Sequence, residues 1–497
     1  MIKNYSVKRI FSFILICTLV SCIFSPAVFA EEQTSEEQAV EEQAAEEQSV
    51  EEQAAEEQAA EEQTVEEQAV EEQENERELP AFFQNDELNR LIDENHEKVL
   101  ENGYSELRIP LDVHGIPMSV FSDNSLEVGR KLLEAGYSAY VIGGCTRDFI
   151  MGTDSVDIDI TTNASIEQQR ELFGDALVIH SSNGMDFGLV VFEDEGVDLA
   201  TFQNIPAGYK GIPGVPEFDE SQTTSDSPLA DSFQRDLTLN AIYYDLSNGD
   251  LLDFHDGIYD IREGILDTMV DADTELTVDP RVLLRSIRFR ARYGYNLSDR
   301  LDQAIREHGK EYAKEIRRYD AFNNIRKMMG AGYSVRAFNG LNDYDLTGTM
   351  YPPLKTLLED DEAVSKLEST LAIMDEELNS TGKDGSWALT LLALLQPEIM
   401  RRSEESDPAA ALQSVLDEQE QVFDLSRRRS EIEETYLLTN RLADPTSEFF
   451  SESIRTSDVF DDARILLCMR AIIDESYQKM AEFWSDQEEE EVEQEAA

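Results

Sequence analysis

The spacing of apolar and polar residues changes character near residue 271. Before that point, short apolar runs of strand length alternate with amphipathic helical patterns, the first capped by Asn124 or Ser125 and a later one by Ser165. Strands are expected at 139–142, 156–160, 176–179, 188–192 and 197–202. This mixture predicts an α+β domain with a mixed or antiparallel sheet.

Beyond about residue 271 the remaining pattern is helical, and no further strand is expected. Residues 204–230 are rich in Pro, Gly, Ser and Thr, which predicts a loop or mobile insertion. The shifts in pattern divide the chain into a helical linker at 80–117, the α+β domain at 118–270, a first helical region at 271–340, a second helical region at 341–480 and a disordered acidic tail at 481–497.

Residues 1–30 have the organisation of a secretory signal. Basic residues precede an apolar stretch, and small residues end at Ala30, where we expect cleavage. Cys22 follows Leu-Val-Ser as in a lipoprotein signal, so attachment through an acylated Cys22 is the alternative. Either way we expect an exported protein, secreted or held at the cell surface. Cys145 and Cys468 are the cysteines that follow, and their separation gives no metal-ligand spacing.

Residues 31–75 consist of nine pentads that each begin Glu-Glu-Gln. A five-residue period places the apolar positions on no single helical face, and Glu at this density repels itself at helical spacings. We therefore expect residues 31–79 to form a disordered acidic spacer that holds the folded part away from the cell surface. A specific acidic docking tract is the alternative.

The chain carries 41 Lys and Arg against 105 Asp and Glu, a formal net charge of −64 at pH 7. This charge excludes nucleic-acid binding through an extended basic surface, because such affinity comes from Lys and Arg that neutralise phosphates. A polynucleotide partner would need a local basic stripe. Arg281, Arg285, Arg288 and Arg292 supply one, since their spacing places them on one face of an expected helix. The alternative is a solvated face whose arginines pair with nearby carboxylates.

Asp157 and Asp159 lie two residues apart on an expected strand, so both carboxylates leave the same face. Such a pair suits two divalent cations that share oxygen ligands. Asp198 lies on an alternating hairpin strand and can supply a third carboxylate. In so acidic a chain, a solvated strand face is the competing interpretation.

A glycine turn precedes this pair. Gly143 and Gly144 end one expected strand and open a short helix that carries Arg147. Glycine lets backbone amides approach phosphate oxygens closely, and Arg147 would add a positive charge. A plain connector between strand and helix is the alternative.

Four regions resemble, in order, the motifs of class II tRNA nucleotidyltransferases (CCA-adding enzymes) and bacterial poly(A) polymerases. They are AYVIGGCTRDFIMGTDSVDIDITTNA at 139–164, VDLATF at 197–202, SFQRDLTLNAIYYD at 232–245 with LLDFHDGIYDIREGIL at 251–266, and VDPRVLLRSIRFRARYGY at 278–295. The resemblance implies a polymerase-β-like nucleotidyltransferase head at 118–270, an all-α neck that binds nucleotide and RNA at 271–340, and a helical body at 341–480.

The resemblance also implies a reaction. It is template-independent, Mg²⁺-dependent transfer of nucleotides from ATP, CTP or another nucleoside triphosphate to the 3′ end of a tRNA-like RNA. Asp157, Asp159 and Asp198 would be the catalytic carboxylates and would hold the Mg²⁺. The nucleotide would be bound by Gly143, Gly144, Arg147, Arg235, Asp236, Asn240, Asp279, Arg285 and Arg288.

Three positions depart from the family's pattern. Gln234 stands where the family usually has the first of two arginines before Asp236, and Val278 and Val282 stand where its base-selecting motif has Glu and Arg. Arg281 is one residue from the latter position and points about 100° away from it on a helix. The resemblance therefore leaves the selected base open.

Three functions fit these features. The carboxylates, the glycine turn and the arginine face favour an exported, active nucleotidyltransferase. The scarcity of tRNA and nucleoside triphosphates outside cells, together with the departures at Gln234, Val278 and Val282, favours a non-catalytic exported binding module on the same fold. A nucleotidyltransferase that acts on a protein or a small molecule fits both the metal site and the acidic body. The acceptor and the oligomeric state stay open.

Overall fold

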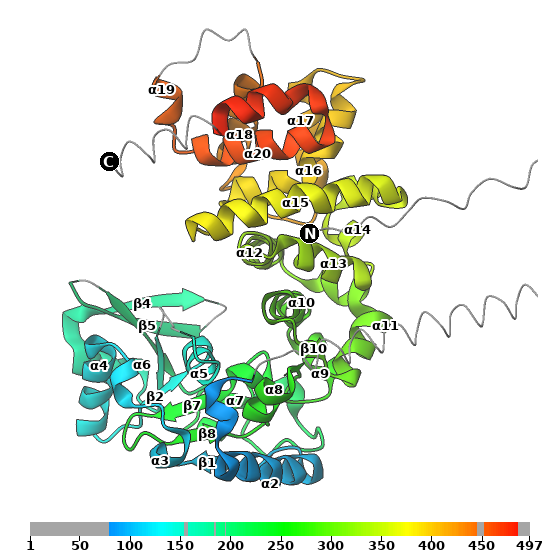
Figure 1. The fold of residues 1–497 in the computed structure, drawn as a ribbon. Coiled ribbons are helices and arrows are strands. Elements are labelled where there is room, and N and C mark those ends of the chain that lie inside the picture. The colour runs from blue at the N-terminus through cyan, green and yellow to red at the C-terminus, as the bar shows by residue number, and fades with distance from the viewer. Residues whose placement is uncertain (1–78, 154–157, 183–184, 194, 445–451, 486–497) are drawn as a thin grey trace, which may run out of the picture. The chain divides into compact units, whose positions relative to one another are not determined.

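The computed structural model describes residues 79–153, 158–182, 185–193, 195–444 and 452–485, which belong to one compact unit that starts at Leu79. An eight-stranded sheet has the order β1-β8-β7-β2-β3-β6-β5-β4 (Figure 1). Its strands are β1 (Leu107–Ile109), β2 (Tyr140–Ile142), β3 (Asp159–Thr162), β4 (Leu177–Ser182), β5 (Met185–Val191), β6 (Gly196–Thr201), β7 (Ile242–Asp245) and β8 (Leu251–Asp253). β3 and β6 are parallel and the other neighbours are antiparallel, so the predicted mixed sheet is confirmed.

Seven helices are described alongside this sheet: α2 (Asp86–Asn102), α3 (Leu111–His114), α4 (Asp123–Glu134), α5 (Gly144–Ile150), α6 (Ile166–Phe173), α7 (Pro228–Ser232) and α8 (Gly257–Glu263). The cap of α4 is Ser122, so the expected caps Asn124 and Ser125 are wrong. Ser122 has an extended backbone and its side chain accepts a hydrogen bond from the amide of Ser125, which already lies inside the helix. Ser165 caps α6 as predicted and forms a capping box with Gln168.

The expected helical linker also contributes a strand. β1 lies within residues 80–117 and pairs with β8 at the edge of the sheet. Its three residues are too few to produce a recognisable alternation of apolar and polar positions, so β1 could not be predicted from the pattern. β3 is described from Asp159 onward, because residues 154–157 lie outside the described ranges.

The rest of the described chain is helical apart from one short pairing. The helices are α9 (Ala272–Val278), α10 (Arg281–Tyr293), α11 (Asp299–Glu315), α12 (Arg318–Met329), α13 (Ser334–Asp343), α14 (Thr347–Met350), α15 (Asp361–Thr381), α16 (Trp387–Ser403), α17 (Pro408–Gln419), α18 (Arg429–Leu442), α19 (Glu452–Arg455) and α20 (Phe460–Ile473). β10 (Asn296–Leu297) pairs in parallel with β9 (Ile265–Leu266), so the expectation of no strand beyond 271 is wrong there. Two residues are again too few for a periodic signal.

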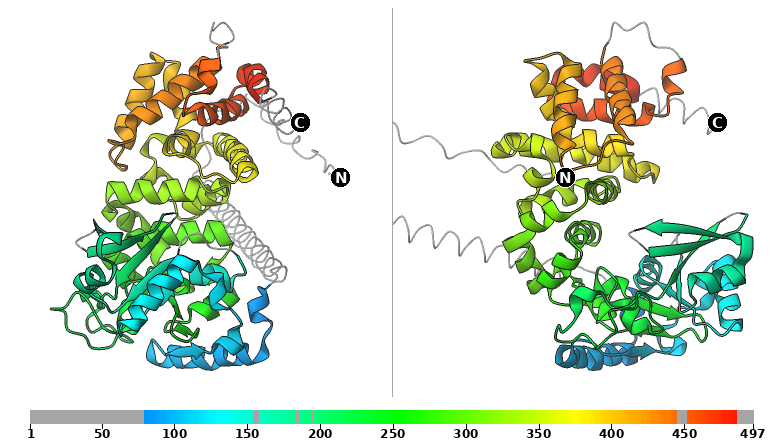
Figure 2. Two further views of the ribbon diagram at one scale, coloured as in Figure 1. Left: turned by 90° about the vertical axis from the view of Figure 1, so that its left-hand side faces the viewer. Right: turned by 180° about the vertical axis from the view of Figure 1, so that it is seen from behind.

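One buried apolar cluster continues from the sheet into the helices. It includes Val141 and Ile160 from the sheet, Leu284 from α10 and Leu392 from α16. α10 packs against α12 and α13 and lies between them and the sheet domain (Figures 1 and 2). The shared core therefore fixes α10 beside the sheet. Within the described ranges, every helix is too short or too polar to cross a bilayer.

Candidate functional site

A cavity of about 840 Å³ lies where the sheet domain faces α10. The structure brings all the expected nucleotide-binding residues together on its wall: Gly143, Gly144, Arg147, Arg235, Asp236, Asn240, Asp279, Arg285 and Arg288. Asp159 lines the same cavity, whereas Asp198 lies beside it on β6. Asp157 lies outside the described residues.

Asp159 and Asp198 are neighbours on adjacent strands. The parallel pairing of β3 and β6 places them at the same register, so their side chains leave the same face of the sheet. Both residues are exposed. Oδ2 of Asp159 lies 3.6 Å from the position that a Cβ atom on Gly143 would take, which puts this carboxylate against the glycine turn.

These carboxylates fit a divalent cation. Adjacent strands lie about 4.8 Å apart, so two side chains on one face can reach a shared ion. Carboxylate oxygens are the ligands that Mg²⁺ prefers. Among the residues that the structure describes, no group of three or more His, Cys, Asp and Glu comes together as a metal site. The third expected ligand, Asp157, lies outside the described residues.

The glycine turn is tied to α10 through Arg147. Gly143 has φ 78°, a conformation that residues with a Cβ rarely adopt. Arg147 is buried, and its guanidinium donates to Oδ1 of Asn240 at 2.5 Å and to Oδ1 of Asp148 at 2.7 Å. The same guanidinium lies 5.3 Å from the ring centroid of Phe289 on α10. These contacts hold the glycine turn against α10 at the cavity wall.

Asp236 connects the sheet domain to the arginine face. Its carboxylate, 8% exposed, accepts hydrogen bonds from Nε of Arg285 and, at 2.9 Å, from Nδ2 of Asn240. Burial raises the pKa of Asp236, but Arg285, Asn240 and Arg288 together bring this pKa below its ordinary value. Asp236 is therefore ionised at neutral pH and holds Arg285 at the cavity wall.

The arginines that were predicted to share one helix face all line the cavity: Arg281, Arg285, Arg288 and Arg292. Arg281 forms an ion pair with Asp279, and Arg285 forms one with Asp236. The alternative interpretation, in which the arginines pair with nearby carboxylates, therefore holds for these two of the four arginines. Nε of Arg288 is buried without a hydrogen-bond partner in the described part of the chain. Burial and the neighbouring Arg285 lower the pKa of Arg288 to about 10, so it remains charged at neutral pH. Such a cation suits an anionic ligand.

Sequence reasoning missed several cavity residues. They are Arg326, Lys327, Tyr333 and Asp384, from α12 and from the segments after α12 and α15. The adjacent Arg326 and Lys327 at the end of a helix were the only sequence signal. These residues reach the cavity because α12 packs against α10, and the helical periodicity of either segment does not encode that contact.

The three departures from the family's pattern have distinct surroundings. Gln234 is exposed, and its Nε2 donates to the carbonyl oxygen of Asn204 at 2.5 Å. Val282 is fully buried in the core, so position 282 cannot reach the cavity, whereas Arg281 lines it. Val278 is 40% exposed and lines a second cavity beside the first. The base-selecting arginine of the family therefore has no counterpart at position 282.

Comparison with known proteins confirms the resemblance. Residues 139–267 match the poly A polymerase head domain. The chain is 31% identical over 267 residues to poly(A) polymerase I of Haemophilus influenzae, covering 52% of this chain and 58% of that protein. It is 30% identical over 223 residues to the CCA-adding enzyme of Bacillus licheniformis, covering 43% and 52% respectively. The chain thus spans about half the length of the curated relatives it matches.

Solved structures share the fold. A tRNA-processing enzyme in its apo form aligns with a TM-score of 0.51 at 18% identity, over 73% of this chain and 91% of that one. A tRNA nucleotidyltransferase complexed with a primer tRNA and an incoming ATP analogue aligns with a TM-score of 0.50 at 18% identity, over 73% and 99%. The predicted order of a mixed-sheet head followed by helices is therefore confirmed.

Proposed function

We propose that this chain, whose residues 139–267 match the poly A polymerase head domain, transfers nucleotides from a nucleoside triphosphate to the 3′ end of an RNA. The relatives that support an RNA acceptor are poly(A) polymerases and CCA-adding enzymes. ATP or CTP is the proposed donor, a tRNA-like RNA is the proposed acceptor, and no template is required.

One observation carries the proposal: opposite charges face each other across a single cavity. The carboxylate of Asp159 and the turn at Gly143 lie on the sheet side, and Arg288 and Arg292 lie on the α10 side. A triphosphate needs positive charge along its phosphates and a metal-binding carboxylate at the reacting phosphorus. This wall offers both within about 840 Å³.

Asp159 and Asp198 would hold Mg²⁺, with Asp157 as the further ligand that the family resemblance implies. Bound there, the metal would polarise the phosphoryl oxygens and favour ionisation of the attacking hydroxyl. The fit rests on two exposed carboxylates at one register of adjacent parallel strands.

The chain's own side chains hold the nucleotide and the leaving group. The oxygen of the RNA 3′ hydroxyl forms a bond to the α-phosphorus and releases its proton to solvent. The bond from that phosphorus to the bridging oxygen breaks, and pyrophosphate leaves with the electron pair. Arg288 and Arg292 compensate the phosphate charge, while Asp236 keeps Arg285 oriented. Arg147 holds the glycine turn in place.

Incorporation of a labelled nucleotide into RNA tests this assignment. Asp159→Asn removes a charge from the proposed metal site, so we expect the rate to fall about a thousandfold or more, since metal stabilisation of the transition state amounts to several kcal/mol. Asp175→Asn, at an exposed aspartate of the same domain, is the matched control and should retain activity. Equal incorporation rates for the two variants would show that Asp159 takes no part in the reaction.

The proposed location is outside the cytoplasm. Residues 1–30 lie outside the described ranges, and their basic, apolar and small-residue order supports export. Cell fractionation separates the alternatives, because Cys22→Ser releases a lipoprotein from the membrane fraction but leaves a secreted protein in the medium unchanged. Recovery of the full chain in the cytoplasm would refute export.

A further inference from the structure

A third cavity, of about 620 Å³, lies at the start of α6 and shares Gln234 with the first cavity. Its volume is typical of pockets that hold small ligands. Asp186 of β5, Thr201 of β6 and the segment that follows β6 complete its wall. The proposed transfer of nucleotides uses the first cavity and assigns no ligand to this one.

The segment after β6 is closed on itself by hydrogen bonds. Gln203 and Thr224 form an isolated β-bridge. Nδ2 of Asn204 donates to the carbonyl oxygens of Asp219 at 2.8 Å and of Gln222 at 3.0 Å. Residues 203–224 therefore form a built wall of the cavity.

Side-chain amides give this wall free hydrogen-bond acceptors. Each of its three glutamines directs its amide nitrogen to an acceptor of the protein itself: Gln203 to the carbonyl oxygen of Thr201 at 2.7 Å, Gln222 to Oδ2 of Asp219 at 3.2 Å, and Gln234 to the carbonyl oxygen of Asn204 at 2.5 Å. The Oε1 atoms of these glutamines accept no hydrogen bond within the described part of the chain. Such oxygens can accept from the N–H groups of a ligand.

Carboxylates add negative charge to the same wall. Glu167, Asp186 and Glu220 line it, and neither Lys nor Arg does so in the described ranges. Glu220 is paired with Lys210, whereas Glu167 and Asp186 accept from serine hydroxyls at 2.9 and 2.5 Å and form no ion pair among the described residues. The amide of Glu167 itself and the hydroxyl of Ser165 lower the pKa of Glu167, so this carboxyl is ionised at neutral pH. The wall therefore favours a cation.

The start of α6 does not convert the cavity into an anion site. A helix N-terminus attracts anions through its free amides. Here Ser165 and Gln168 form a capping box, and the carboxylate of Glu167 accepts from its own amide. Arg170, three residues further along α6, attracts Glu167 but forms no ion pair with it in the described part of the chain. The carboxylates of Glu167 and Asp186 therefore set the charge of this wall.

Gln234 connects this wall with the proposed phosphate site. It lines the first cavity together with Arg235 and Arg288, and it also lines the third. The family resemblance implies an arginine at position 234, so this chain carries a neutral amide where a positive charge was expected. A cation held in the third cavity against Gln234 would place positive charge beside the phosphates again.

We propose that the third cavity binds a small organic cation with two or more ammonium groups, and that this cation supplies the positive charge that the chain itself lacks at Gln234. An ammonium group has three N–H donors and no acceptor, which matches a wall of amide oxygens and carboxylates. Two ammonium groups on one short carbon chain can contact Glu167 or Asp186 with one end and Gln234 with the other, since all three residues line one cavity. The effect of the cation on the triphosphate rests on the proposed function, whereas its binding does not.

Calorimetric titration of the full chain with spermidine, without RNA or nucleotide, tests the site itself. Glu167→Gln combined with Asp186→Asn removes both unpaired charges and should raise the dissociation constant for spermidine about tenfold. Glu171→Gln, at an exposed glutamate of the same helix that does not line the cavity, is the matched control and should bind spermidine as the unaltered chain does. The remaining acidic residues are common to these proteins, so the difference in affinity reports on the cavity. Equal constants for the double variant and the unaltered chain would overturn the site.

Triphosphate binding at constant ionic strength tests the role of the cation. In the unaltered chain, spermidine should lower the dissociation constant for ATP or CTP about threefold or more. It should have no such effect in the double variant, which separates its action through the cavity from its direct association with the triphosphate. Gln234→Arg carries the charge itself, so it should bind the triphosphate more tightly without spermidine, bind spermidine more weakly and respond little to it.

These outcomes are independent of one another. Spermidine that binds in the cavity but leaves triphosphate binding unchanged would overturn the role beside Gln234. An equal response to spermidine in Gln234→Arg and in the unaltered chain would overturn that role as well. If the unaltered chain incorporates no nucleotide into RNA, the proposed transfer fails, while the two calorimetric comparisons still decide whether the cavity holds a cation and whether that cation assists the triphosphate.

Discussion

At the scale of single residues, Arg285 and Arg288 show two ways of holding a cation at the cavity. Arg285 is paired with the buried carboxylate of Asp236. Arg288 has a buried Nε without a hydrogen-bond partner in the described part of the chain, and its pKa is lowered to about 10. The first arginine therefore stabilises the fold, whereas the second costs stability in the absence of an anion.

This contrast predicts opposite effects on stability. Arg285→Met removes the ion-pair partner of the buried Asp236 carboxylate and leaves it only the hydrogen bond from Asn240 and the charge of Arg288, so the free energy of unfolding should fall by about 1–3 kcal/mol. Arg288→Met removes an unsatisfied charge, so stability should stay the same or rise, while the dissociation constant for a nucleoside triphosphate should increase about tenfold. Thermal unfolding and calorimetric titration of both variants check this. A loss of stability in Arg288→Met equal to that in Arg285→Met would contradict it.

Residue spacing predicted part of this site. Arg281, Arg285, Arg288 and Arg292 needed only the helical repeat to be placed on one face, and the structure puts all four on the cavity wall. Arg326 and Lys327 of α12 could not be assigned to the same wall, because they reach it only through the packing of α12 against α10.

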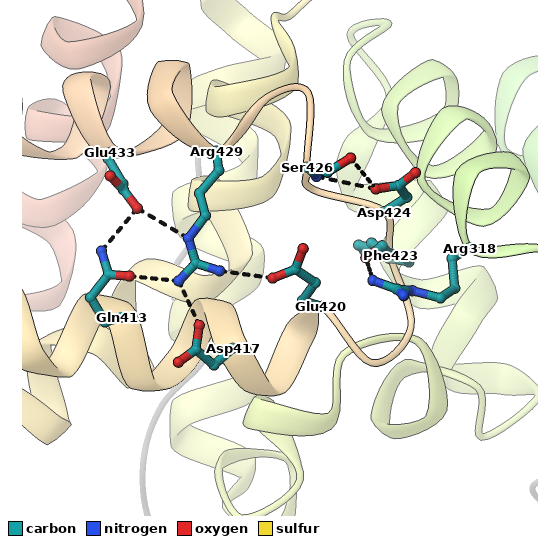
Figure 3. Close-up of polar contacts among 9 residues, drawn as sticks. All are labelled: Arg318, Gln413, Asp417, Glu420, Phe423, Asp424, Ser426, Arg429 and Glu433. Atoms are coloured by element: carbon teal, nitrogen blue, oxygen red, sulfur yellow. Dashed lines mark hydrogen bonds and ion pairs between the residues drawn. The ribbon is translucent and has the colours of Figure 1, made fainter.

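At the scale of elements, the corner between α17 and α18 is organised by one arginine (Figure 3). Arg429, the first residue of α18, donates to Gln413 and Asp417 at 2.5 Å each, to Glu420 at 2.8 Å and to Glu433 at 3.1 Å. A cation at a helix N-terminus is unfavourable to the helix dipole, and these carboxylates offset it.

The same corner is connected to the helix that lines the cavity. Nη2 of Arg318 on α12 donates to the carbonyl oxygen of Phe423 at 3.2 Å. Asp424 accepts from the amide and the hydroxyl of Ser426 at 3.1 and 2.6 Å, which closes the loop before α18 (Figure 3). The corner thus contributes to holding α12, whose Arg326 reaches the cavity wall.

Arg429→Ala should therefore lower the free energy of unfolding by about 1–2 kcal/mol, because several partly exposed ion pairs are lost together. Arg427→Ala is the matched control. Arg427 is an exposed arginine two positions earlier and donates none of the four hydrogen bonds of Arg429, so its removal should change stability by less than about 0.5 kcal/mol. Urea unfolding measures both. Equal effects would show that the network adds nothing beyond the loss of one charge.

The elements were predictable where their patterns were long. The hairpin of β5 and β6 and the face of α10 follow from period-two and 3.6-residue repeats. β1 and β10 were missed because two or three residues cannot show a period, and they exist only through pairing with β8 and β9. Packing of α12 against α10 likewise depends on tertiary contacts.

At the scale of the whole molecule, a chain of net charge −64 contains a cavity lined by arginines. The acidic surface repels polyanions in general, so the RNA of the proposed reaction is expected to bind through few phosphate contacts at this cavity rather than along an extended surface. The helical spacing of the four arginines predicted a local basic stripe in an acidic protein, and the structure places Arg281, Arg285, Arg288 and Arg292 on one cavity wall.

The most direct test measures which products contain the α-phosphate and the γ-phosphate of the donor triphosphate. The full chain is incubated with an RNA primer, Mg²⁺ and ATP or CTP labelled at either the α- or the γ-phosphate. Nucleotidyl transfer predicts the α label in lengthened RNA and the γ label in an equal amount of pyrophosphate, with both lost in Asp159→Asn. Release of the γ label as inorganic phosphate with no lengthening of the RNA, or the α label bound to protein, would contradict it.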